Sequence, residues 1–315
     1  MRLQNKNNFI KSAVGLCFII ILSACFTGIE STPKITQKEV KKQNVSETPE
    51  QNFLSGVLPL PPATWSPGKR FFISDNRVGR TAWKIEPLSE IDSLYGYQAV
   101  LLSVDSIKDL TGAGEIQLSF RIPERNASMI FRTGLNPQQW TDAKNYTIPH
   151  FIDMDLVNSV KDRLINNSFY ILPARRLGLN GNDTIGTRYQ QVNILNVLPA
   201  TESTPFRVFF TDEEGHYNSV LMTVGDLTTS RRNFETIFSL ENPRLKYKQI
   251  DDSTWNLICH GKVREGMSRE ECKLALGAPD SFIQIPSSGG LVERWSFANG
   301  SFLVFEDGIL SRFRL

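Results

Sequence analysis

The side chains most able to do chemistry in this sequence are the neighbours Cys259 and His260. A thiol beside an imidazole is the pairing that activates a cysteine nucleophile. A structural alternative is that His260 closes a short predicted helix just before Gly261, where a cationic side chain interacts favourably with the helix dipole. We favour the helix-closing role, so the pair predicts no catalytic residue.

The other ionisable residues do not assemble a recognisable catalytic or metal motif. His150, His216 and His260 do not stand at zinc-ligand spacing from Cys, Asp or Glu. Phosphate-binding loops, dinucleotide fingerprints and the Gly-x-Ser-x-Gly motif of hydrolases are missing from the sequence. The acidic run 212–214 could bind a cation, but such turns between strands are usually solvated. We therefore predict no enzyme, no metal and no cofactor.

One residue does indicate a covalent modification. Three basic residues within the first eleven positions precede an apolar stretch of about ten residues, which has the length of a signal-peptide core rather than of a membrane span. The stretch ends in the run 22–25 (Leu-Ser-Ala-Cys), which resembles the bacterial lipobox. The resemblance implies cleavage before Cys25 and attachment of acyl chains such as palmitate. The alternatives are a plain secretory signal or a signal anchor with a chance cysteine.

A lipidated Cys25 predicts an envelope protein held on a membrane by its lipid. The residues after it, 26–28, include no Asp that would indicate retention at the inner membrane, so we expect the outer membrane. Outside the cytoplasm the remaining cysteines, Cys259 and Cys272, could form a disulfide. They could equally be two small buried thiols.

Charge excludes one class of partner. Cleavage after residue 24 leaves 32 basic residues against 33 acidic ones, since Arg2, Lys6 and Lys11 are removed from the 35 of the whole chain. A nucleic-acid-binding protein would show a strong basic excess. We therefore expect no nucleic acid among the partners.

Composition and periodicity divide the chain into seven segments. Short β-rich runs make up two units that resemble one another, each with a Tyr-Gln pair (at Tyr97 and Tyr189) before its central strand, as expected for a tandem duplication. Chance similarity of β-rich stretches is the alternative. The segments are a signal peptide (1–24), a lipidated disordered tether (25–67), β unit 1 (68–134), a helical spacer (135–166), β unit 2 (167–228), a linker (229–249) and a C-terminal domain (250–315).

The C-terminal domain shows the clearest local signals. Asp251 is a helix cap, and Ser268 with Glu271 three residues later is a capping box before a second helix. Three strands then follow, joined by two-residue turns at 299–300 (Asn-Gly) and 307–308 (Asp-Gly). These turns set the register expected for the sheet.

In that register each strand alternates between a core face and a second face. The expected core face carries Trp295, Phe297, Phe302, Val304, Ile309, Phe313 and Leu315. The second face has an apolar centre surrounded by arginines, the usual composition of a protein contact surface. We predict partner binding there by Arg294, Leu303, Phe305, Leu310, Arg312 and Arg314. Coverage of this face by the rest of the chain is the alternative.

The stretch 261–279, the strand at 293–297 and the end at 305–310 together resemble the BamE/SmpA-type domain of envelope lipoproteins. The shared features are a Gly-Met-Ser helix start, Leu-Gly-x-Pro, a strand with Glu-x-Trp and a final Asp-Gly hairpin. The resemblance covers about a fifth of the chain. It implies two helices against a three-stranded antiparallel sheet. With the two β units, whose alternating strands and turns suit small barrels or sandwiches, we expect an α+β fold overall.

The expected function is that of a non-catalytic, lipid-anchored scaffold or interaction module with an envelope protein as partner. By the resemblance, it would support outer-membrane assembly or integrity. One alternative is a surface lipoprotein that binds cell-wall glycan, with Trp83, Tyr95 and Trp140 stacking on sugars. The other is a protein inhibitor, since the fold that the resemblance implies also serves in that role.

Overall fold

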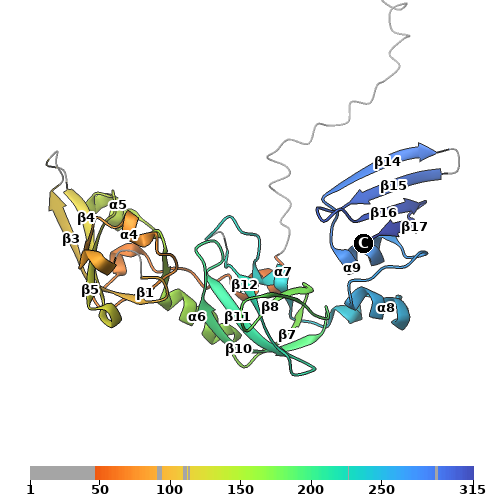
Figure 1. Ribbon diagram of the computed structural model, residues 1–315, viewed down its shortest axis with the longest axis horizontal. Coiled ribbons are helices and arrows are strands. Elements are labelled where there is room, and N and C mark those ends of the chain that lie inside the picture. The colour runs from red at the N-terminus through yellow and green to blue at the C-terminus, as the bar shows by residue number, and fades with distance from the viewer. Residues whose placement is uncertain (1–46, 91–93, 109–111, 113, 226, 288–289) are drawn as a thin grey trace, which may run out of the picture. The chain divides into compact units, whose positions relative to one another are not determined.

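The computed structural model describes residues 47–315, except 91–93, 109–111, 113, 226 and 288–289. These residues belong to one compact unit, Glu47–Leu315. They form three antiparallel sheets of six, seven and four strands (Figure 1). The expected α+β class with a three-stranded C-terminal domain is therefore wrong, because the described chain is strand-rich and its last sheet has four strands. The expected signal peptide and the expected lipidation site, Cys25, lie outside the described residues.

The first sheet has the strand order β2-β5-β4-β3-β1-β6. Its inward side chains alternate with exposed ones along β4 and β5, as expected for strands with one buried face. The strands are β1 (Arg70–Ile73), β2 (Lys84–Glu86), β3 (Gln98–Lys108), β4 (Gly114–Ile122), β5 (Ala127–Arg132) and β6 (Phe151–Asp153). The short helices α4 (Val78–Thr81) and α5 (Pro137–Asp142) belong to the same unit.

The second sheet has the order β13-β7-β10-β11-β12-β8-β9. Its strands are β7 (Ser168–Ile171), β8 (Arg175–Gly178), β9 (Asp183–Ile185), β10 (Gln191–Pro199), β11 (Phe206–Asp212), β12 (Tyr217–Met222) and β13 (Phe238–Ser239). Helix α7 (Phe234–Ile237) precedes β13 directly. Six strands of this sheet repeat the order of the first sheet in the same chain sequence, with β9 added at the edge. This common topology supports the predicted duplication.

Helix α6 (Met154–Leu164) connects the two sheets and matches the helix expected from the apolar spacing. Asp153 caps it by accepting a hydrogen bond from the Asp155 amide. Its buried side chains, Leu156, Val157, Val160 and Leu164, pack into the core of the second sheet. The expected spacer over 135–166 is thus divided: α5 and β6 belong to the first unit, and α6 packs in the core of the second.

The first unit is inserted into the second. Leu54 and Val57, which precede the first sheet in the sequence, are buried in the core of the second sheet together with Ile152 from β6. The neighbouring Phe151 belongs to the first core, as does Trp65. The chain therefore leaves the second core after Val57, builds the first sheet and returns at Ile152.

The expected tether over 25–67 is folded in its last part. Helix α3 (Pro49–Phe53) begins at a capping box formed by Thr48 and Gln51. Phe53 stacks on Phe234 with ring centroids 4.6 Å apart. The folded chain thus begins before residue 68, the start expected for β unit 1. Its first apolar anchors lie in proline-rich, polar sequence that gave no sign of them.

The C-terminal sheet consists of β14 (Ser281–Ser287), β15 (Gly290–Ser296), β16 (Phe302–Glu306) and β17 (Ile309–Arg314), in that order. Helices α8 (Asp252–Cys259) and α9 (Arg269–Leu276) begin at the predicted caps, Asp251 and Ser268. Strand β14 was not predicted. The domain therefore departs from the two-helix, three-strand arrangement of the BamE/SmpA type.

Candidate functional sites

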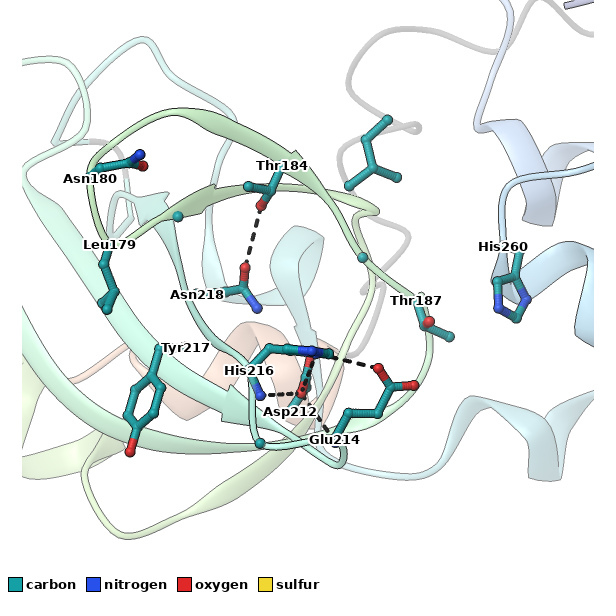
Figure 2. A pocket seen from close by; sticks show the side chains of 14 residues that line it. Leu179, Asn180, Thr184, Thr187, Asp212, Glu214, His216, Tyr217, Asn218 and His260 are labelled. Atoms are coloured by element: carbon teal, nitrogen blue, oxygen red, sulfur yellow. Dashed lines mark hydrogen bonds and ion pairs between the residues drawn. The ribbon is translucent and has the colours of Figure 1, made fainter.

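An open hollow of about 850 Å³ lies beside β8, β9 and the turn that joins β11 to β12 (Figure 2). Its lining side chains include two imidazoles and two carboxylates. The side chains labelled in Figure 2 are Leu179, Asn180, Thr184, Thr187, Asp212, Glu214, His216, Tyr217, Asn218 and His260. Sequence reasoning missed this hollow because its residues come from segments far apart in the chain.

A buried ion pair lies beside the hollow. Arg176 of β8 is completely buried, and its Nη1 lies 3.4 Å from Oδ2 of Asp212, itself only 5 % exposed at the side chain. Arg176 Nη2 also donates to the Thr187 carbonyl. Burial lowers the pKa of Arg176, and the charge of Asp212 opposes that shift. The pair joins β8 to the end of β11, and nothing in the sequence marks Arg176 as buried.

The carboxylate of Asp212 is occupied by the turn that follows it. Its Oδ1 accepts hydrogen bonds from the amides of Glu214 (3.2 Å) and His216 (2.8 Å). The His216 Nδ1 atom lies 3.5 Å from Asp212 Oδ1 and 3.3 Å from Glu214 Oε2, on a side chain that is two-thirds exposed. Asp212 is thus held by Arg176, Glu214 and His216 and shapes the turn, so it is poorly placed to act as a general base.

The described residues contain no group of three or more His, Cys, Asp or Glu side chains that could hold a metal ion. The acidic run at 212–214 fits this result, because Asp212 is paired with Arg176 and the amide of Gln191 donates to Glu213. The hollow offers hydrogen-bonding groups and one exposed ring, Tyr217, but no activated nucleophile.

Cys259 and His260 lie at the end of α8. His260 is the C-cap residue, and its Nδ1 is 2.8 Å from the Asn256 carbonyl, as the helix-closing prediction requires. Burial raises the pKa of Cys259 to about 11, against the opposing charges of Arg188 and Arg244. A neutral thiol is a weak nucleophile at neutral pH. The geometry therefore favours the structural role.

Of the two alternatives left open for the cysteines, the disulfide is not formed in the structure. Cys259 and Cys272 are both free thiols, and Cys272 is completely buried in the C-terminal core. Burial raises the pKa of Cys272 to about 12, with a further contribution from Glu271. Cys272 packs as a small apolar group in this core, and Cys259 is partly buried.

The predicted partner-binding face is half wrong, and the reason is the first hairpin. Phe297 pairs with Ser301 across a three-residue loop, Ala298 to Gly300, instead of the expected two-residue turn. The register shifts by one, so Trp295 pairs with Leu303 rather than with Val304. A shift of one residue exchanges the two faces of a strand.

Leu303, Phe305 and Leu310 are consequently buried in the C-terminal core instead of forming a contact surface. Phe305 packs against Trp295 with ring centroids 4.7 Å apart. The second turn is as predicted, since Glu306 pairs with Ile309 and both Asp307 and Gly308 have positive φ. A bulge after it separates Leu310 from Arg312, so the two residues lie on opposite faces.

The side of the sheet opposite the helices nevertheless has the composition that was predicted. We call it the outer face, formed by Ile283, Ile285, Val292, Arg294, Phe302, Val304, Glu306, Arg312 and Arg314. Helix α9 packs on the other side through Cys272 and Ala275 (Figure 1). Arg294, Arg312 and Arg314 lie on this face as expected, whereas its apolar centre consists of Phe302 and Val304 instead of Leu303 and Phe305.

The three arginines of the outer face make no ion pair with a carboxylate among the residues that the structure describes. The guanidinium carbons of Arg294 and Arg314 lie 4.9 and 5.4 Å from the centroid of the Phe302 ring. Arg312 is exposed. The outer face thus presents an apolar centre with three arginines and one exposed carboxylate, Glu306, which forms no ion pair with them in the described part of the chain.

The aromatic residues proposed for sugar stacking separate into two groups. Trp140 is 5 % exposed and packs edge-on against Trp65, so it is a core residue. Trp83 and Tyr95 are exposed, and the Arg132 guanidinium lies 3.5 Å from the Trp83 ring centroid. Because Arg132 covers one side of the Trp83 ring, only the other side could stack on a sugar, which argues against a role of Trp83 in sugar binding.

Comparison of the chain with protein-family models, curated proteins and solved structures finds no match. Within the described residues, the structure contains no helix of the length and hydropathy needed to cross a membrane.

Proposed function

We propose that this chain is a non-catalytic, lipid-anchored protein of the bacterial outer membrane that docks an envelope protein partner through its outer face. The observation that carries the docking part is the combination of an apolar centre with three arginines that lack carboxylate partners. Interfaces are enriched in aromatic residues and arginine at their centres. The partner that fits is a protein surface with apolar side chains bordered by Asp or Glu.

The anchor is proposed from the lipobox-like run that ends at Cys25. The residues that follow the anchor are long enough to separate the folded unit from the lipid surface. The disordered tether predicted from the sequence would extend on the order of 25 Å over the roughly 20 residues between Cys25 and Glu47. Labelling cells with an alkyne fatty acid tests the anchor, since Cys25→Ser should abolish incorporation into this chain.

The docking proposal is tested by photo-crosslinking in living cells. A photoreactive side chain at Val304, on the outer face, should give a discrete crosslinked band, whereas one at the exposed Leu88 of the first unit should not. Arg312→Glu should remove the band, because the exposed arginine has no partner within the described chain and its charge reversal repels an acidic surface.

Arg80→Glu supplies the matched control, since Arg80 is an exposed arginine of the first unit. A band from Val304 that survives Arg312→Glu contradicts the acidic partner. The absence of any band from Val304, together with a strong band from Leu88, places the docking surface elsewhere.

A further inference from the structure

Strand β14 is an edge strand with an unusual surface. It pairs with β15 over all seven residues and has no strand on its other side in the sheet. Phe282, Ile283 and Ile285 are 61 %, 60 % and 56 % exposed, although they point to both faces of the sheet. Long, exposed apolar edges are templates for pairing with another strand, and proteins usually protect them with charges.

This edge carries no charge, and its sequence is nearly symmetrical. The strand reads Ser-Phe-Ile-Gln-Ile-Pro-Ser from 281 to 287, with Gln284 at the centre. Reversing the strand exchanges only Phe282 and Pro286. A sequence of this kind presents nearly the same side chains to an antiparallel copy of itself.

The hydrogen bonds of β15 show which groups of β14 are free. The Leu291 carbonyl accepts from the Asp307 amide, and the Phe297 amide donates to Ser301. The odd-numbered residues of β15 therefore point their backbone groups toward β16, and the even-numbered ones toward β14. Because backbone groups alternate sides along a strand, the groups of Phe282, Gln284 and Pro286 point to the open edge.

We propose that β14 pairs with β14 of a second copy of this chain, antiparallel and centred on Gln284. The two Gln284 residues exchange both backbone bonds, and each Phe282 amide donates to the Pro286 carbonyl of the other copy. That gives about four inter-chain hydrogen bonds, because proline lacks the remaining donor. The result is a continuous eight-stranded sheet with two-fold symmetry.

The side chains agree with this pairing on both faces. Ile283 lies opposite Ile285 of the other copy, so four β-branched side chains meet on the outer-face side. Phe282 lies opposite Pro286 on the helix side. Neither contact brings like charges together, and the arginines of the outer face stay uncovered.

A second copy fits better than a strand of another protein. A strand without charges cannot select a charged partner, whereas its near-symmetrical order is satisfied by its own reverse. A pair of seven-residue strands buries less surface than a standard interface, so we expect a dissociation constant on the order of 10 µM. The pairing uses the edge of the sheet and does not depend on the docking function proposed above.

The test is sedimentation equilibrium of residues 26–315, which contain the whole compact unit. The protein should dimerise in the micromolar range. Ile283→Lys/Ile285→Lys should remain monomeric at about 300 µM, at least a thirtyfold weakening, because lysines then face lysines. Ile283→Lys/Ile285→Glu should dimerise again, because the antiparallel register places each lysine opposite a glutamate.

Leu58→Lys/Leu60→Lys, which changes two exposed leucines elsewhere, should leave the dimer intact. Hydrogen exchange of the unaltered protein gives a second measurement, since the amides of Phe282 and Gln284 should become protected as concentration rises. A protein that is monomeric at 300 µM, a lysine pair that still dimerises, a Lys/Glu pair that stays monomeric, or unprotected amides each overturn the proposal.

Discussion

Gly186 is the position where a single methyl group should reveal how rigidly the buried Arg176 is held. An ideal Cβ on Gly186 would lie 2.5 Å from Cζ and Nη1 of Arg176 and 2.7 Å from its Nε. The φ of Gly186 is not in the left-handed region, so alanine is acceptable to the backbone there. Any cost of Gly186→Ala therefore comes from the guanidinium.

The size of that cost follows from how little the guanidinium can move. Asp212 holds it on one side and the Thr187 carbonyl on another, and the Phe210 ring centroid lies 5.6 Å away. Extra methyl groups in a tightly packed site cost about 1–3 kcal/mol. Because this site is fixed by a buried ion pair, we expect Gly186→Ala to lower the free energy of unfolding by about 2–3 kcal/mol.

The background Arg176→Ala/Asp212→Asn removes the obstacle without leaving an unpaired buried charge. There, Gly186→Ala should be neutral or stabilising by about 0.4–1 kcal/mol, since alanine reduces the entropy of the unfolded chain. The coupling free energy is then about 3 kcal/mol. Native-state hydrogen exchange of the β11 amides measures this coupling free energy for the second sheet, apart from the rest of the molecule.

Gly56→Ala is the control, because the nearest atom to its Cβ, from Arg163, is 3.9 Å away. Equal costs of Gly186→Ala in the two backgrounds would refute the reasoning. So would a cost no larger than that of Gly56→Ala.

Three further outcomes are expected in the C-terminal domain. Phe305→Asp should lower the free energy of unfolding by at least about 4 kcal/mol, whereas Phe302→Asp on the outer face should cost about 1 kcal/mol, as measured by urea unfolding followed through tryptophan fluorescence. Ser268→Ala should cost about 1 kcal/mol in the same assay, because it removes the cap on α9. Burial raises the pKa values of Cys259 and Cys272 to about 11 and 12, so stability should be complete below pH 9 and decline above it as the thiols of the unfolded chain ionise first. Unfolding at pH 8 and pH 10 checks the sign, and a cysteine-free variant with the same decline would contradict the assignment.

Local signals predicted the helices of the C-terminal domain, and the failure lay in the strands. Asp251 and Ser268 mark helix starts through side-chain hydrogen bonds within four residues, so sequence alone is enough. The length of the loop around Asn299 depends instead on whether Ala298 belongs to the loop or to β15. That loop length sets the register of β16 and therefore which of its faces is buried. Pro286 made β14 resemble a loop, although edge strands tolerate proline where the missing amide would face outward.

The site beside β8 could not be predicted at all. Arg176 and Asp212 are 36 residues apart, and only the sheet order brings β8 next to β12 and the end of β11. The duplicated topology was visible in part, because the two Tyr-Gln pairs at Tyr97 and Tyr189 precede corresponding strands. The insertion of one unit in the other was concealed, since Leu54 and Val57 lie in a proline-rich segment.

That insertion determines how the molecule would bear mechanical tension. A force applied to the chain before residue 47 acts first on α3. This helix is held to the second unit by Glu50, whose carboxylate accepts hydrogen bonds from the Ser239 hydroxyl and the Leu240 amide, both at 3.3 Å. Lys69 clamps the base of the inserted unit by contacting Asp153 and Asp155 at 2.8 and 2.6 Å. Tension between the two chain ends would therefore act on the second unit first and not on the six-stranded sheet. The six-stranded sheet would come under load only after α3 detaches from the core of the second unit.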